Sequence, residues 1–266
     1  MNTNKVLKEI VDRAKVFVFD LDGTIYLGNN LIGNVKETFD KIRNSSRKIV
    51  YLTNNSSRTD GEYIKKLKKL KIYSKQDIFY SSLDCAADYI LKNLPDKKIY
   101  ALADKKVNRY LARHGIKLSE KADAVLITFD KHLTYKKIAT TNRLLLDNKL
   151  YIATHPDAVC PTDKESVPDL GSFIKLFELS SGRTPQIIIG KPYTFMADYI
   201  AAVTNAEKGE MVMFGDRLNT DIAFAKNSGM RSVLVLTGEA TEKDLETSDV
   251  LPDAVTFSVN DVADYL

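Results

Sequence analysis

Two aspartates follow a short apolar run near the N-terminus, in the segment FDLDGT (19–24). Carboxylate oxygens bind a hard cation such as Mg²⁺, which in turn binds phosphate. Asp20 and Asp22 are therefore candidates for the chemistry of a phosphate ester, although such a pair alone is equally well explained as turn residues.

Three further polar segments contain the other groups that this chemistry needs. YLTNNSS (51–57) supplies a hydroxyl and amides for phosphate oxygens, IIIGKP (187–192) supplies a lysine, and MFGDRLNTD (213–221) supplies more carboxylates. Each also has an ordinary explanation as a helix cap or a turn. A Mg²⁺ site needs oxygen ligands, typically one or two carboxylates together with substrate phosphate. The segments together provide such a set.

The elements that must position these segments are short apolar runs directly before them. VFVF (16–19), KIVYLT (48–53), QIIIGK (186–191) and MVMFGD (211–216) have the pattern of strands buried on both faces of a parallel sheet. Ligands of an open parallel sheet bind beyond the carboxyl ends of its strands. We therefore expect all four polar segments to converge on one crevice.

The rest of the chain also alternates strands with helices. This alternation predicts an α/β protein with a Rossmann-like core of parallel strands and right-handed crossovers. Further strands are expected at 98–103, 123–129, 149–154 and 232–237, a loop at 154–172, and helices at 35–42, 64–70, 83–94, 105–113, 134–146, 173–177, 194–204 and 220–229.

Composition and charge exclude several other classes. The chain has 266 residues, which fits two domains at roughly 150 residues each. It lacks an apolar run of the roughly 18 residues that a membrane span needs, and its beginning lacks a secretory pattern, so we expect a cytoplasmic protein without a membrane partner. Its lysine run KKLKKLK (65–71) is best explained as a solvated helix face, so no nucleic-acid partner is expected. We expect Cys85 and Cys160 to be two reduced structural thiols.

Other catalytic classes lack their signatures. Neither cysteine is followed by an arginine at the spacing of a cysteine-phosphatase loop, and the sequence contains neither GxxxxGK[ST] nor GxSxG. A cysteine phosphatase, a P-loop kinase and a serine hydrolase of that type are therefore excluded.

The four segments resemble the ordered motifs of the haloacid-dehalogenase (HAD) superfamily. The motif residues are FDLDGT, Thr53, Lys191 and GDRLNTD (215–221), and the longer segments FDLDGTIYLGN, YLTNNSSRT, IIIGKP and GDRLNTDI look like its p-nitrophenylphosphatase and pyridoxal-phosphatase branch. The resemblance spans essentially the whole chain. It implies Mg²⁺-dependent hydrolysis of a small phosphate monoester, of the sugar phosphate, nucleotide, phosphoglycolate or pyridoxal phosphate class, through an aspartyl phosphate. The alternative is a phosphate-binding or regulatory protein that keeps the fold without turnover.

The resemblance implies catalytic roles for three residues. Asp20 would be the nucleophile and a metal ligand. Asp22 would protonate the leaving group, deprotonate the attacking water and bind Mg²⁺ through its backbone carbonyl. Lys191 would neutralise both the nucleophile and the phosphate.

The resemblance also implies binding roles. Thr53 and the backbone of Asn54 would hold the phosphate, and Asn55 would face the substrate. Asp216 would be the remaining carboxylate ligand of Mg²⁺, and Asp221 would orient Lys191 or a water on the metal.

Proteins of this family carry an inserted cap domain, and the spacing of the motifs indicates where in the chain it is inserted. Only a short flap and one helix fit between Asp22 and Thr53, whereas 137 residues separate Thr53 from Lys191. An inserted α/β cap domain is therefore expected at 83–181, with a discontinuous catalytic core at 1–82 and 182–266. This arrangement, and the presence of Asp22, argue against a phosphomutase and a dehalogenase of the same superfamily.

The cap is expected to supply selectivity, because the core motifs contact only the phosphoryl group that all substrates share. TFDKHLTY (128–135) resembles the cap segment that approaches the leaving group in relatives, so Asp130 and His132 are candidate substrate contacts. A homodimer that forms through the cap is compatible with this arrangement.

Overall fold

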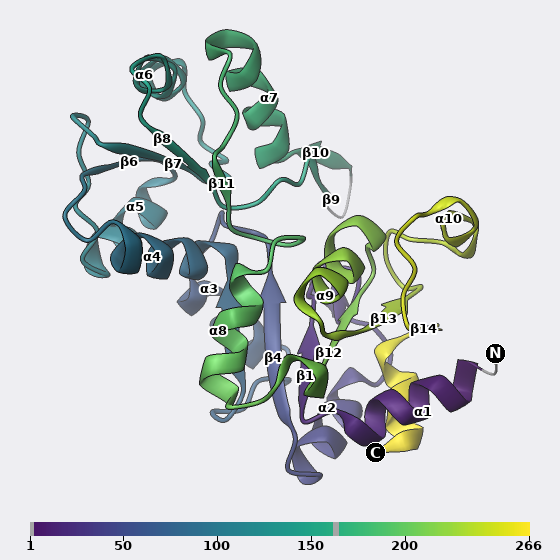
Figure 1. The fold of residues 1–266 in the computed structure, drawn as a ribbon. Coiled ribbons are helices and arrows are strands. Elements are labelled where there is room, and N and C mark those ends of the chain that lie inside the picture. The colour runs from purple at the N-terminus through teal and green to yellow at the C-terminus, as the bar shows by residue number, and fades with distance from the viewer. Residues whose placement is uncertain (1–2, 162–164) are drawn as a thin grey trace. The chain divides into compact units, whose positions relative to one another are not determined.

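A computed structural model of the protein describes residues 3–161 and 165–266, and these form two compact units. The first unit comprises residues 3–53, 64–80 and 191–266, and the second comprises 54–63, 81–161 and 165–190. Each unit is built around its own sheet, drawn as arrows in Figure 1.

The sheet of the first unit has six strands in the order β14-β13-β12-β1-β4-β5. In chain order these are β1 (Val16–Phe19), β4 (Lys48–Thr53), β5 (Ile78–Ser81), β12 (Met211–Gly215), β13 (Arg231–Val235) and β14 (Ala254–Thr256). Strand β1 pairs in parallel with both β4 and β12, and all four of its residues are fully buried. The continuous apolar runs of these strands are explained by this position inside the sheet, where both faces are covered.

Helices flank this sheet (Figure 1), and a small hairpin follows β1 in the chain. The helices are α1 (Thr3–Arg13), α2 (Val35–Asn44), α3 (Asp60–Lys69), α8 (Phe195–Thr204), α9 (Ala223–Ser228), α10 (Glu242–Thr247), the π-helix Leu218–Ile222 and the 3-10 helices Lys208–Glu210 and Val259–Tyr265, and the hairpin pairs β2 (Tyr26–Leu27) with β3 (Asn30–Leu31). The first residues of α3 belong to the second unit and the rest to the first. The flap expected after Asp22 is this hairpin.

The sheet of the second unit has four parallel strands in the order β11-β8-β7-β6. These are β6 (Ile99–Leu102), β7 (Ala124–Ile127), β8 (Leu150–Ala153) and β11 (Ile187–Ile188), and the helices are α4 (Ser82–Asn93), α5 (Lys105–Arg113), α6 (Tyr135–Leu146) and α7 (Leu170–Ser181). A buried apolar cluster that includes Val125, Leu145 and Phe177 packs β7, α6 and α7 together. The α/β class and the parallel sheets are thus as expected from the sequence.

Two elements differ from the expected pattern. The segment 154–172, expected to be a loop, contains the antiparallel pair β9 (Val159–Pro161) and β10 (Ser166–Pro168). The apolar run before Lys191 is a strand, as expected, but not of the first sheet. Ile187 pairs with Ile152 and Ile188 with Ala153, so β11 occupies the free edge of β8. Consequently residues 182–190, expected in the core range, pack in the second unit, as do residues 54–63.

In the part of the chain described here, none of the helices combines the length and apolar character required to cross a bilayer.

Candidate active site

Three carboxylates and one lysine meet at the carboxyl edge of the first sheet. Asp20 directly follows β1 and Asp216 directly follows β12, and these two strands are parallel neighbours. The Nζ atom of Lys191 lies 2.5 Å from Asp20 Oδ1 and 2.6 Å from Asp221 Oδ1. Oxygen atoms of Asp20, Asp216 and Asp221 all lie within 4.8 Å of one another. The structure therefore brings these four sequence-predicted residues together.

The carboxylates of this cluster are crowded and poorly solvated. Burial raises the pKa of the Asp20 carboxyl well above its ordinary value, the charges of Asp221 and Asp216 add to the rise, and Lys191 opposes it. Burial and the charge of Asp221 raise the pKa of Asp216 to about 6. Burial acts to lower the pKa of the Lys191 ammonium, but Asp20 and Asp221 outweigh it and the pKa is raised. Negative charge exceeds positive charge at this site, which favours the binding of a cation.

Glycines allow the chain to approach two of the carboxylates closely. A Cβ atom on Gly23, whose φ is +89°, would lie 2.4 Å from Asp216 Oδ2. A Cβ atom on Gly238 would lie 2.0 Å from the same oxygen, and one on Gly215 would lie 2.2 Å from Asp221 Cβ. Real Cβ atoms do not approach other atoms this closely, so any larger residue at these positions would displace the carboxylates.

The loop after β13 contributes contacts that the sequence analysis missed. The backbone N–H of Glu239 donates to Asp216 Oδ2 at 2.8 Å, and the hydroxyl of Thr237 donates to the carbonyl of Gly23 at 2.7 Å. Thr24 donates to the other oxygen of Asp216 at 3.3 Å. The available signal was the polar segment TGE directly after the predicted strand at 232–237, which is the same pattern as in the four motifs.

The side chain of Asp22 is more accessible than the carboxylates of Asp20, Asp216 and Asp221. Its side chain is 46% exposed, and its Oδ1 atom lies 4.0 Å from Lys66 Nζ. The same ammonium lies 3.5 Å from the centre of the Tyr26 ring. Lys66 belongs to the lysine run that the sequence analysis assigned to a solvated helix face, but its side chain is only 17% exposed. That interpretation is wrong for Lys66, because the residue packs on the hairpin instead of facing solvent.

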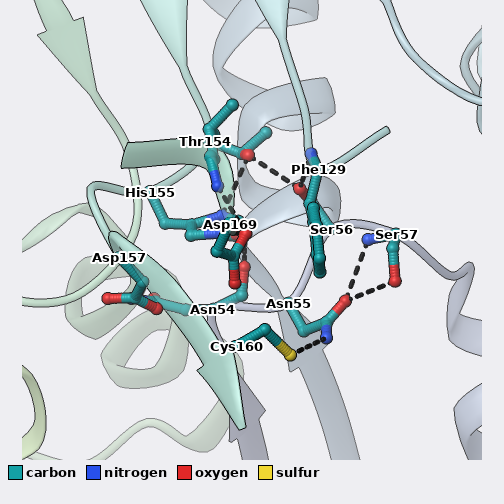
Figure 2. Close-up of polar contacts among 12 residues, drawn as sticks. Asn54, Asn55, Ser56, Ser57, Phe129, Thr154, His155, Asp157, Cys160 and Asp169 are labelled. Atoms are coloured by element: carbon teal, nitrogen blue, oxygen red, sulfur yellow. Dashed lines mark hydrogen bonds and ion pairs between the residues drawn. The ribbon is translucent and has the colours of Figure 1, made fainter. Parts of the chain in front are cut away.

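The phosphate-binding candidates fall on both sides of the boundary between the units. Thr53 is the last residue of β4 and is buried in the first unit. Asn54 and Asn55 belong to the second unit. The side-chain amide of Asn54 donates to Asp157 at 3.1 Å, and Asn55 Oδ1 accepts from the backbone N–H and the hydroxyl of Ser57, as Figure 2 shows for Asn55.

The two candidate substrate contacts of the second unit differ in accessibility. Asp130 is buried, and its Oδ2 atom lies 2.5 Å from Lys137 Nζ. The side chain of His132 is 78% exposed, and its Nδ1 atom lies 2.6 Å from Asp104 Oδ2. Of the two, only His132 is exposed enough to contact a substrate, whereas Asp130 supports the loop through Lys137 and the backbone N–H of His132.

The donor set of the first unit fits a hard divalent cation. All its groups are oxygens, and the acidic cluster has too few cations of its own to balance it. Asp221 is the least suited of the three to be a ligand, because its Oδ1 atom accepts from the charged Lys191 and its Oδ2 atom from the backbone N–H of Arg217 at 3.1 Å. The donors to Asp216, by contrast, are the neutral hydroxyl of Thr24 and the N–H of Glu239. Asp20 and Asp216 remain as the carboxylates that fit a cation of this kind.

Comparison with known families gives matches at both ends of the chain. Residues 17–117 match the family described as haloacid dehalogenase-like hydrolase, and residues 188–264 match a HAD-hydrolase-like family. The described motif residues Asp20, Thr53, Lys191, Asp216 and Asp221 all lie within these two ranges.

Individual relatives cover nearly the full chain. Phosphoglycolate phosphatase 2 of Arabidopsis thaliana is 33% identical, covering 96% of this chain and 94% of the relative. Acid sugar phosphatase of Staphylococcus aureus is 32% identical, covering 93% and 95%. The crystal structure of a 4-nitrophenylphosphatase from Thermotoga maritima is 36% identical and superimposes with a TM-score of 0.92, covering 96% of this chain and 98% of that one.

Proposed function

This chain belongs to the haloacid dehalogenase-like hydrolases and is a phosphatase of the p-nitrophenylphosphatase branch, and from that premise we propose that it hydrolyses small phosphate monoesters with Mg²⁺ through an aspartyl phosphate on Asp20. The observation that carries the proposal is the position of Lys191, whose ammonium contacts Asp20 and Asp221 within a buried acidic cluster. This arrangement suits a carboxylate nucleophile and an anionic substrate.

The residues that would hold Mg²⁺ are Asp20, Asp216 and the backbone carbonyl of Asp22. When bound, the ion would neutralise charge on the phosphoryl oxygens and on the carboxylates. The Thr24 hydroxyl and the N–H of Glu239 each donate to one oxygen of Asp216. These two hydrogen bonds fix the orientation of the carboxylate.

In the first step, an oxygen of Asp20 attacks phosphorus and the bond from phosphorus to the leaving oxygen breaks. The leaving oxygen keeps that electron pair and takes a proton from Asp22, which suits a carboxyl group that is half exposed and reachable by the alcohol. Lys191 stabilises the charge on the phosphoryl group, and Asp221 holds its ammonium in place.

In the second step, a water molecule attacks phosphorus and gives its proton to Asp22. The bond from phosphorus to Asp20 breaks, which returns the electron pair to that carboxylate and releases inorganic phosphate. Thr53 and the backbone N–H of Asn54, consecutive in the chain, would hold the phosphate through both steps, with Asn55 facing the substrate.

The substrate would be a small phosphate ester, and the second unit would act as the cap that selects it. Relatives carry the names phosphoglycolate phosphatase, acid sugar phosphatase and 4-nitrophenylphosphatase, which supports this class of substrate without choosing among its members.

Turnover of p-nitrophenyl phosphate tests the proposal against the alternative of a binding protein without turnover. We expect hydrolysis with Mg²⁺, loss of activity with EDTA and recovery when Mg²⁺ is restored. Binding of phosphate without hydrolysis under these conditions would support the alternative.

We predict that the two aspartates of FDLDGT can be distinguished by leaving group. Asp22→Asn should reduce turnover of an alkyl phosphate at least about tenfold more than turnover of p-nitrophenyl phosphate, because p-nitrophenolate needs little protonation to leave. Steady-state rates on both esters measure this. Asp198→Asn, at an exposed aspartate of the same unit, is the control and should change neither rate. Equal losses on both esters would remove the acid role from Asp22.

We also predict that Mg²⁺ affinity depends on pH through Asp20 and Asp216, because the pKa of each carboxyl is raised. With a pKa of about 6, Asp216 is mostly protonated at pH 5 and ionised at pH 7.5, and protons compete with the cation. The affinity should therefore weaken about tenfold or more from pH 7.5 to pH 5, as measured by titration calorimetry. The Asp198→Asn protein should keep this dependence. Equal affinity at both values would contradict the assignment of Asp216 as a ligand.

A further inference from the structure

The second unit contains a buried polar network that the mechanism above does not use. At its centre is His155, whose side chain is fully buried. Its Nε2 atom lies 3.0 Å from Asp169 Oδ1, and its Nδ1 atom lies 3.1 Å from the hydroxyl of Thr154. That hydroxyl lies 2.8 Å from the hydroxyl of Ser56, which accepts from the backbone N–H of Phe129 at 2.9 Å (Figure 2).

Only one end of this network has a fixed donor, since the N–H of Phe129 donates to the hydroxyl of Ser56. The hydroxyls of Ser56 and Thr154 can each donate and accept, and so can the ring of His155 between its two nitrogens. Each of these buried polar groups therefore has a hydrogen-bond partner within the network.

The network joins four segments that are distant in the chain. Ser56 lies in the segment 54–63 that enters the second unit, Phe129 follows β7, and Thr154 and His155 follow β8. Asp169 caps the N-terminus of α7, where its Oδ1 atom accepts from the N–H of Leu170 at 2.6 Å. Because leaving a buried polar group without a hydrogen-bond partner is costly, these four segments are held in one arrangement.

The segment in which the chain finally leaves the second unit, at Gly190, packs against the same network. The N–H of Gly190, the last residue of the second unit, donates to the carbonyl of Thr154 at 2.7 Å. A Cβ atom on Gly190 would lie 2.5 Å from Asn54 Oδ1 and 3.0 Å from His155 Cβ. Asn54 and Gly190 are thus packed tightly together, and their chain neighbours are Thr53 and Lys191.

We propose that His155, Thr154 and Ser56 are positioning residues that fix the segment beginning at Asn54. They would thereby fix the phosphate contact assigned to the backbone of Asn54 and the substrate-facing position assigned to Asn55. This inference rests on the proposed function. Asn54 is held from two further sides, since its carbonyl accepts from the hydroxyl of Ser82 at 2.5 Å and its amide donates to Asp157. Ligand atoms of His155, Asp157 and Asp169 lie close enough together for a metal site. Both ring nitrogens of His155 already have hydrogen-bond partners, so we assign the imidazole to the network.

The test compares two isosteric substitutions within the second unit. Thr154→Val removes the hydroxyl that links Ser56 to His155. Thr141→Val removes an equally buried hydroxyl in α6, which donates to the carbonyl of Lys137 at 2.9 Å and lies outside the network. Neither substitution changes the shape of the side chain much, but Thr154→Val loses hydrogen bonds to both Ser56 and His155 and should lose more stability than Thr141→Val. The melting temperature of each variant is therefore measured alongside its activity. Ser56→Ala is a second network variant, and it removes the hydroxyl that contacts Thr154 and Phe129 N–H.

We expect Thr154→Val and Ser56→Ala to lower kcat/KM about tenfold, for acetyl phosphate as much as for p-nitrophenyl phosphate. The loss should be uniform because the phosphate contact is common to all esters. The affinity for inorganic phosphate should weaken by a similar factor. Thr141→Val should keep the wild-type values of all three. A merely structural network would instead lower the melting temperature of the variants and leave kcat/KM and phosphate affinity unchanged, which would overturn the proposal.

Hydrogen exchange of the amides of residues 54–57 separates this inference from the proposed function. Exchange should accelerate in Thr154→Val and Ser56→Ala but not in Thr141→Val, and this result does not depend on any activity. Unchanged exchange in the network variants would overturn the anchoring role. Absence of Mg²⁺-dependent hydrolysis by the wild-type protein would instead contradict the proposed function, whatever the exchange data show.

Discussion

Replacement of Asp20 by Asn is expected to lower turnover of p-nitrophenyl phosphate by about a thousandfold or more, with the fold retained. The amide keeps the size of the side chain but has no charge with which to attack phosphorus. It also removes one negative charge from a cluster that is too acidic for its single lysine, so the metal-free variant should be at least as stable as the wild type. Steady-state kinetics and thermal unfolding without metal measure both effects.

Asp77→Asn provides the matched control for this substitution. Asp77 is also a buried, ion-paired aspartate of the first unit, and its Oδ2 atom lies 2.7 Å from Arg43. Its loss leaves Arg43 without this partner and should cost about 3–5 kcal/mol of stability, while kcat of the folded protein stays near the wild-type value. A folded Asp20→Asn protein that keeps more than a few per cent of activity would show that Asp20 is not the nucleophile.

The second large effect is expected at Lys191. Lys191→Met keeps the length of the side chain but removes the ammonium that Asp20 and Asp221 share. Three neighbouring carboxylates then lack their cation, so the metal-free variant should lose about 3–5 kcal/mol of stability. Turnover should fall about a hundredfold or more, because charge on the phosphoryl group is no longer stabilised.

Mg²⁺ provides a diagnostic for the cause of this loss. The ion should raise the melting temperature of Lys191→Met more than that of the wild type, because it restores positive charge to the cluster. Lys208→Met, at an exposed lysine that pairs with Asp198, should be close to the wild type in stability, turnover and response to Mg²⁺. An active Lys191→Met protein would contradict the role of Lys191.

The sequence predicted the first unit well where a local pattern and its position in the sheet agree. Phe19 and Asp20 show this, because a fully buried strand has a continuous apolar run and its polar successor must lie at the sheet edge. The same reasoning placed Asp216 after β12, and the structure brings the two carboxylates together.

The prediction was incomplete where pairing between distant strands decides the outcome. An apolar run predicts that Ile187 and Ile188 are extended, but not which sheet they join, and β8 offered the edge that they occupy. Lys66 was misread for a related reason. Its helix has lysines on several faces, and only the hairpin after Asp22 determines which of them is covered.

The buried network around His155 shows a further limit. Thr154 and Asp169 lie outside the four motif segments, Ser56 lies in YLTNNSS (51–57) without an assigned role, and the segment 154–172 was expected to be a loop. Its role depends on contacts between residues up to 98 positions apart, which no local pattern contains. The TGE segment at 237–239, by contrast, is a polar segment at the end of a predicted strand, which is the local pattern that identified the four motifs.

The most direct test of the account is a search for the phosphorylated aspartate. Wild-type protein is mixed with labelled phosphate ester and Mg²⁺, quenched in acid during turnover, and digested for peptide mapping. We expect a base-labile phosphoryl group on Asp20, absent without Mg²⁺ and absent from the Asp20→Asn protein. Sustained turnover with the phosphoryl group on another residue, or with none on the protein under conditions that stabilise acyl phosphates, would contradict it.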